Sequence, residues 1–123
     1  MKILVYGNPL VEEDSAALKL SKILKIPGVE FQEFDSLEDF PDRNPVIMDV
    51  GNTEKPRVLN DINKIEKNQG YSMHDYDLAF QLKIMKKMSQ IDSATIIVLP
   101  KKITNKNQTE VEKIIENLKA TSR

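Results

Sequence analysis

Three separate segments of the chain carry side chains that can bind a divalent metal ion or exchange a proton. The first is the acidic run Glu12-Glu13-Asp14, the second is Asp49, and the third is His74, the only histidine in the chain. Carboxylate oxygens and imidazole nitrogens are donors for divalent metals, and both groups also act as general acids and bases. Each segment therefore supplies a candidate for metal binding or acid–base chemistry.

Each of these side chains also has a structural role that would account for it. Asp14 can cap the helix that follows it, because a carboxylate accepts hydrogen bonds from the free N–H groups of a first turn. Asp49 can accept a hydrogen bond in the turn at Gly51. His74 can lie on the surface where a helix begins. No one of them identifies a site by itself.

The elements that must position these residues are short strands alternating with amphipathic helices. The predicted strands cover residues 3–6, 29–34, 46–48, 57–60 and 95–99. The first, third and last of these are apolar runs typical of buried strands, the second alternates apolar with polar residues, and the fourth is expected to be a short edge strand.

Three helices are predicted from apolar positions that recur every three or four residues. The first is capped by Asp14 or Ser15 and ended by Pro27-Gly28, and the second starts at Asp75. The apolar stripes of the three helices are Ala17, Leu20, Ile23 and Leu24; Leu78, Leu82 and Met85; and Val111, Ile114, Ile115 and Leu118.

This alternation predicts one α/β domain over residues 1–123. We expect a three-layer α/β/α architecture, with a mostly parallel sheet of about five strands and helices on both faces. In such sheets, ligands bind outside the carboxyl ends of the strands. The rule brings Asp14, Asp49 and His74 to one edge of the predicted sheet.

Composition narrows the class of protein. The chain has 18 basic and 19 acidic residues, and a net charge of -1 gives no general attraction to nucleic acid or to a membrane surface. The pairs Lys86-Lys87 and Lys101-Lys102 are interpreted as solvated surface. The absence of cysteine excludes disulfides, thiolate metal sites and a cysteine nucleophile. The apolar start is too short for a signal peptide, so we expect a cytoplasmic protein.

Three motifs, in order, resemble those of the hydrogenase maturation proteases. The first is Gly7-Asn8-Pro9-Leu10-Val11-Glu12-Glu13-Asp14, the second is Val46-Ile47-Met48-Asp49, and the third is Ser72-Met73-His74-Asp75-Tyr76-Asp77-Leu78. The first joins Gly-Asn to an acidic pair before a helix, the second is an apolar strand that ends in aspartate, and the third is a His-Asp element that opens a helix.

The resemblance implies an endopeptidase that removes the C-terminal extension of a hydrogenase large subunit precursor. It implies that Asp14, Asp49 and His74 are the catalytic residues and bind nickel, which arrives with the precursor. Gly7, Asn8 and Asp75 are expected to bind substrate. The partner is then the precursor, with no nucleic acid and no membrane, and the enzyme is expected to be a monomer or a weak dimer.

The chain departs from the family pattern at two positions, since Ser15 and Ala17 stand where the family has glycine. No serine has a visible triad partner, so no side-chain nucleophile is identified. A carbonyl polarised by the metal, or a water activated by it, is the candidate for the cleavage step.

Two other interpretations remain open. A receiver-like phosphoacceptor domain would use Glu13 and Asp14 as its acidic pair, Asp49 as the phosphorylated residue and Lys101 as the lysine after the last strand, and it leaves His74 without a role. A non-enzymatic module would dock a partner through its first loop, and changing His74 would then have no effect.

Overall fold

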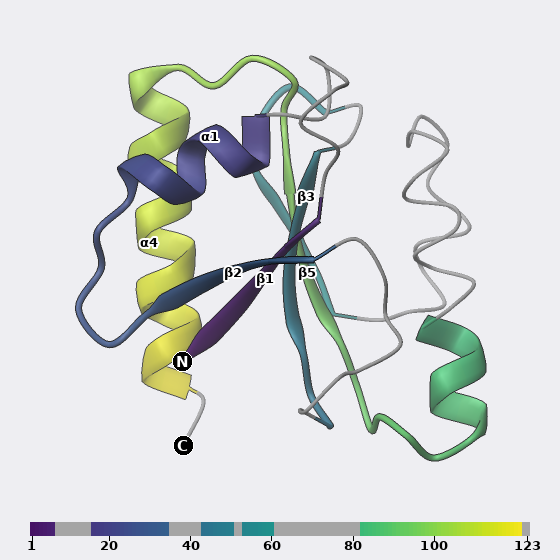
Figure 1. The fold of residues 1–123 in the computed structure, drawn as a ribbon. Helices are drawn as coiled ribbons and strands as arrows, with labels where there is room; N and C mark the ends of the chain where they lie inside the picture. The colour runs from purple at the N-terminus through teal and green to yellow at the C-terminus, as the bar shows by residue number, and fades with distance from the viewer. Residues whose placement is uncertain (7–15, 35–42, 51–52, 61–81, 122–123) are drawn as a thin grey trace.

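The computed structural model describes residues 1–6, 16–34, 43–50, 53–60 and 82–121, and a five-stranded sheet lies at the centre of this part of the chain (Figure 1). The strands are β1 (Lys2–Tyr6), β2 (Glu30–Phe34), β3 (Val46–Val50), β4 (Arg57–Leu59) and β5 (Thr95–Leu99). Their order is β2-β1-β3-β5-β4, and only β4 is antiparallel to its neighbour. The predicted mostly parallel sheet and its five strand segments are confirmed.

The order of the strands follows from their composition. β3 and β5 are apolar along nearly their whole length. They lie inside the sheet, where each pairs with a strand on both sides and packs against a hydrophobic core on each face. β2 lies at one edge, and its alternation leaves Glu30 and Gln32 exposed while Phe31 packs against the core. β4 is the short strand at the other edge.

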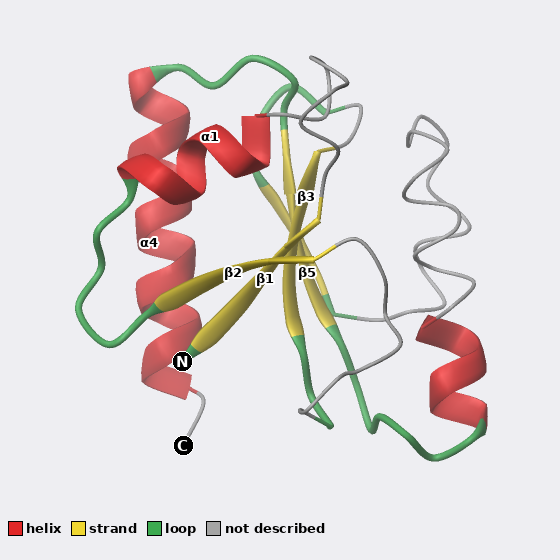
Figure 2. Cartoon of the chain, viewed as in Figure 1, coloured by secondary structure: helices red, strands yellow, loops and turns green. Residues whose placement is uncertain are grey.

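Helices cover both faces of the sheet, as predicted. α1 (Ala16–Ile23) and α4 (Asn105–Thr121) lie on one face, and the helical residues 82–87 lie on the other (Figures 1 and 2). Two hydrogen bonds cap the start of α4. The Thr104 N–H donates to the Asn107 side chain, and the Asn107 N–H donates to the Thr104 hydroxyl. This reciprocal cap satisfies N–H groups that a helix leaves free at its start.

Alternate residues of the strands contribute to two separate hydrophobic cores, one on each face of the sheet. The first core contains Leu20, Leu24, Val111 and Ile115 of the helices with Ile3, Val5, Met48, Val50, Ile97 and Leu99 of the strands. The second contains Leu82, Ile91 and Ala94 with Leu4, Ile47, Leu59, Ile96 and Val98. The three-layer arrangement therefore rests on strands that are apolar on both sides.

One predicted core position is wrong. Ile23 was expected on the inward stripe of α1, but 59% of its surface is exposed. Successive helical residues are about 100° apart, which places Ile23 roughly 80° around the helix from the midpoint between Leu20 and Leu24. The helix also ends at Ile23, before the predicted stop at Pro27-Gly28, and the following residues bring Ile26 and Val29 against the core.

A clamp joins the segments that lead into β3 and β5. The Arg43 guanidinium makes two hydrogen bonds to the Asp92 carboxylate, at 2.9 and 3.1 Å. The Asp92 N–H donates to the Arg43 carbonyl at 2.7 Å, and the Ser93 hydroxyl donates to the Asn44 side chain at 2.8 Å. These contacts hold the amino ends of the two central strands together, so they help fix the register of the strands.

The first core predicts a large difference between two isoleucines in helices. Ile115→Ala removes a fully buried side chain of α4 and should lower the free energy of unfolding by about 2–5 kcal/mol, because a cavity remains. Ile23→Ala removes an exposed side chain and should cost less than about 1 kcal/mol. Urea denaturation followed by circular dichroism measures both. Equal losses would contradict the core assignment.

The clamp predicts a pH-dependent contribution to stability. The hydrogen bonds from Arg43, helped by its charge, hold the pKa of Asp92 below its ordinary value of 3.8. A carboxyl group whose pKa is lower in the folded protein stabilises the fold above its unfolded pKa, and this contribution is lost as the pH falls through the folded value. Asp92→Asn should therefore lower the urea midpoint at about pH 7 and should lower it less at a pH below the ordinary value of 3.8.

The effect should be modest and sensitive to salt, because 57% of the Arg43 side chain and 59% of the Asp92 side chain are exposed. Glu54→Gln, at an exposed carboxylate, is the matched control and should leave the midpoint nearly unchanged at both pH values. A loss from Asp92→Asn that is identical at both pH values would show that the ion pair is not its cause.

Candidate active site

Asp49 lies near the carboxyl end of β3, at the centre of the sheet. It is the fourth of five residues in the strand and is fully buried. One of its carboxylate oxygens accepts a hydrogen bond from the Val50 N–H at 2.8 Å. The side chain is therefore held in place at the edge of the sheet where ligands of parallel α/β proteins bind.

The strand register places Arg57 in the same row as Asp49. Val98 of β5 is opposite Asp49 of β3 on one side and opposite Arg57 of β4 on the other. Asp49 follows Ile47 by two residues and Arg57 precedes Leu59 by two, and both Ile47 and Leu59 belong to the second core. Because strand side chains alternate, Asp49, Val98 and Arg57 share one face of the sheet.

The burial of the Asp49 carboxylate is energetically unfavourable, and this makes the residue a candidate for function. Transferring an ionised carboxylate from water into a protein interior is unfavourable unless the charge is paired or binds a cation. An apolar residue would fit the sequence pattern of β3 better than aspartate does, since Ile47, Met48 and Val50 are all buried. Asp49 is thus the described residue best placed to bind a cation or accept a proton at this edge.

The other predicted site residues lie outside the described residues. These are Asp14 and His74, proposed as metal ligands, and Gly7, Asn8 and Asp75, proposed to bind substrate. Within the described ranges, no three histidine, cysteine, aspartate or glutamate side chains come together in a way that could hold a metal ion. The convergence of Asp14, Asp49 and His74 therefore stays a prediction.

Sequence reasoning missed a group of basic residues at the same edge. β4 runs antiparallel to β5, so its amino end lies beside the carboxyl end of β5. This arrangement brings Lys55 and Arg57 to the end of the sheet from which Lys101 and Lys102 continue. Lys101 and Lys102 by themselves did not indicate a site in the sequence. Their grouping with Lys55 and Arg57 depends on the antiparallel direction of β4.

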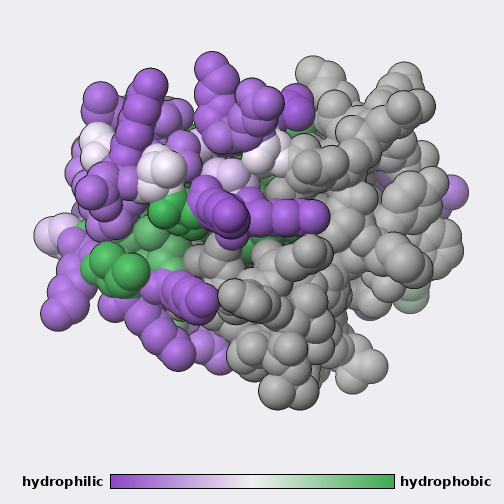
Figure 3. All heavy atoms as spheres, turned by 90° about the horizontal axis from the view of Figure 1, so that it is seen from above, coloured by the Kyte–Doolittle hydropathy of each residue, from purple (hydrophilic) through white to green (hydrophobic). Residues whose placement is uncertain are grey.

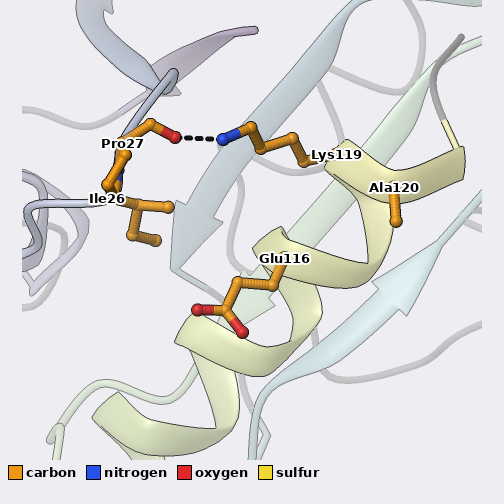
Figure 4. Close-up of a pocket in the computed structure, with 5 residues that line it drawn as sticks. All are labelled: Ile26, Pro27, Glu116, Lys119 and Ala120. Atoms are coloured by element: carbon orange, nitrogen blue, oxygen red, sulfur yellow. Dashed lines mark hydrogen bonds between the residues drawn. The ribbon is translucent and has the colours of Figure 1, made fainter.

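A hollow at the opposite end of the sheet lies beside contacts that secure the turn into β2. It lies between the segment before β2 and the last turns of α4, and Figure 4 shows the Lys119 ammonium group donating to the Pro27 carbonyl beside it. The N-terminal amino group donates to the Gly28 carbonyl at 2.7 Å, and Gly28 has φ +79°. These contacts secure the turn into β2 at the amino end, away from Asp49.

Among the helices of the described residues, none has the length and apolar character needed to cross a bilayer.

Comparison with solved structures identifies the fold. The chain is similar to the [NiFe] hydrogenase maturation protease HybD from Thermococcus kodakarensis, with a TM-score of 0.66 and 18% identity over 100% of both chains. It is also similar to an endopeptidase from Escherichia coli, with a TM-score of 0.57 and 16% identity over 96% of this chain and 90% of that one. No protein-family model matches the sequence, and no curated protein matches it. The chain thus has a hydrogenase maturation protease-like fold.

Proposed function

We propose that this chain is an endopeptidase that removes the C-terminal extension of a nickel-loaded hydrogenase large subunit precursor. The observation that carries the proposal is the fully buried carboxylate of Asp49 at the carboxyl end of β3. The resemblance to the family motif implies a functional aspartate at that point of the chain, and the fold is similar from end to end to that of a hydrogenase maturation protease.

Recognition of the precursor depends on the nickel that it carries. Asp14, Asp49 and His74 would contact this nickel as part of the substrate, and Gly7, Asn8 and Asp75 would bind the precursor chain near it. Imidazole suits nickel, whereas carboxylates discriminate poorly among divalent metals. With no cysteine in the chain, the protease offers no thiolate ligand, so a complete coordination shell requires donors from the precursor.

The sheet argues against the receiver-like alternative. Receiver domains have a doubly wound sheet with strand order 2-1-3-4-5. Here β5 lies directly beside β3, and β4 runs antiparallel at the edge beyond it. The non-enzymatic module remains the competing proposal, and the effect of changing His74 separates the two.

Cleavage of the precursor tests the proposal. A nickel-loaded large subunit, mixed with the wild-type protein, should lose its C-terminal peptide, and intact-protein mass spectrometry measures the loss. Asp49→Asn and His74→Ala should each slow this reaction by about 100-fold or more, the range expected for a group that acts directly on the reacting atoms.

Glu116→Gln is the control, because it neutralises an exposed carboxylate of α4 beside the hollow at the opposite end of the sheet from Asp49. It should cleave at the wild-type rate under conditions where both variants are folded by circular dichroism. Cleavage by His74→Ala at the wild-type rate would contradict the proposed role of the imidazole, and no cleavage by the wild type would contradict the protease assignment itself.

The dependence on substrate donors predicts weak binding of free nickel. Isothermal titration of the protein alone with a nickel salt should give a dissociation constant no tighter than the micromolar range, because two carboxylates and one imidazole leave the coordination shell incomplete. Addition of the metal-free precursor should tighten the apparent affinity. A tight stoichiometric complex of nickel with the protease alone would show that the metal is a resident cofactor.

A further inference from the structure

We propose that a cluster of basic residues, the basic edge, holds a carboxylate of the peptide on which the enzyme acts. The basic edge consists of Lys55, Arg57, Lys101 and Lys102, at the end of the sheet where β4 begins and β5 finishes. The inference rests on the proposed function, since it assigns the peptide to the C-terminal extension of the precursor, and it adds the chemical feature by which this extension is recognised.

The first support is the position of Arg57 relative to Asp49. The two residues lie in one row, with the single strand β5 between them. Neighbouring strands are about 4.8 Å apart, so the two backbone positions are separated by roughly 10 Å. Both side chains leave the same face of the sheet, and Arg57 is exposed whereas Asp49 is buried. A peptide that reacts beside Asp49 and runs toward β4 therefore comes within reach of Arg57.

The second support is the local charge. The chain as a whole has one more acidic than basic residue, yet the described segments 53–57 and 100–104 contain the four basic residues of the basic edge and the single acid Glu54. All four basic residues are exposed. Figure 3 views the molecule from this end, and most of its described surface belongs to hydrophilic residues. This local positive charge, on the side of the edge formed by β4 and β5, attracts an anionic segment.

The third support is the chemistry of the guanidinium group. Arginine presents a rigid, planar fork of N–H donors that matches the two oxygens of a carboxylate. An extended arginine side chain spans roughly 7 Å, and an extended peptide advances about 3.3 Å per residue. Arg57 can thus bind a carboxylate within about five residues of the peptide bond at Asp49. The carboxylate belongs either to the chain end or to an aspartate or glutamate side chain of the extension.

Steady-state cleavage by Arg57 variants tests the assignment. Arg57→Gln should raise KM for the nickel-loaded precursor by about 10-fold and change kcat by less than about twofold, because the contact binds substrate without entering the chemistry. Arg57→Lys should recover part of the loss, and about 0.5 M salt should reduce the difference from wild type. Lys113→Gln removes one exposed positive charge from α4 and should leave both constants unchanged.

A binding measurement separates this inference from the proposed function. The probe is a fluorescein-labelled peptide with the sequence of the C-terminal extension, and fluorescence anisotropy gives its dissociation constant for the whole protein. Tighter binding to wild type than to Arg57→Gln supports the inference even if the precursor is not cleaved. Weakening by amidation of the peptide end assigns the carboxylate to the terminus, and weakening by Asp→Asn and Glu→Gln changes assigns it to side chains. Equal binding of every peptide to wild type and Arg57→Gln overturns it.

Discussion

The parallel pairing of β3 with β5 is the constraint on which the candidate site depends. This register sets Asp49 opposite Val98, and a slip of one residue in β3 would turn Asp49 from the second core to the first, among Ile97, Leu99 and other apolar side chains of the neighbouring elements. Apolar residues on both faces of the two strands oppose such a slip. The contacts between Arg43 and Asp92 oppose it as well, because they join the chain segments immediately before the two strands. The site is thus specified by packing and hydrogen bonds that lie at the far end of the strands from the carboxylate itself.

The position of Asp49 also shows how the fold accommodates a destabilising group. A carboxylate buried between apolar strand residues costs free energy that an isoleucine or valine would not. The surrounding structure compensates through two hydrophobic cores and through the hydrogen bond from the Val50 N–H, which fixes one carboxylate oxygen. Proteins commonly retain such groups where function requires them, at the expense of stability.

The features that follow from local patterns could be predicted, and those that depend on distant contacts could not. The apolar runs of β3 and β5 predicted buried parallel strands, and the position of Asp49 at a strand end predicted a place at the functional edge. The pairing of Arg43 with Asp92 joins residues 49 positions apart and leaves no periodic signal. The antiparallel direction of β4 is likewise set by tertiary packing. The sequence therefore predicted a short edge strand there but not that Arg57 would share a row with Asp49. For Asp14 and His74, the motif remains the only support.

The proposed site divides recognition between metal and peptide. Two carboxylates and an imidazole bind several divalent metals with little discrimination, so the metal contact alone cannot distinguish the precursor from other metal-carrying proteins. Contacts outside the metal site must supply that difference in affinity, because specificity is the difference between two binding free energies. The backbone of Arg57, in the basic edge, lies roughly 10 Å from that of Asp49, a span that an extended peptide covers in about three residues. A substrate that presents both a bound metal and a carboxylate at this spacing gains from the two contacts together. Under this proposal, a metal contact too weak to retain free nickel would be an advantage, because it would allow the protein to dissociate once the peptide that carries the carboxylate has been cut away.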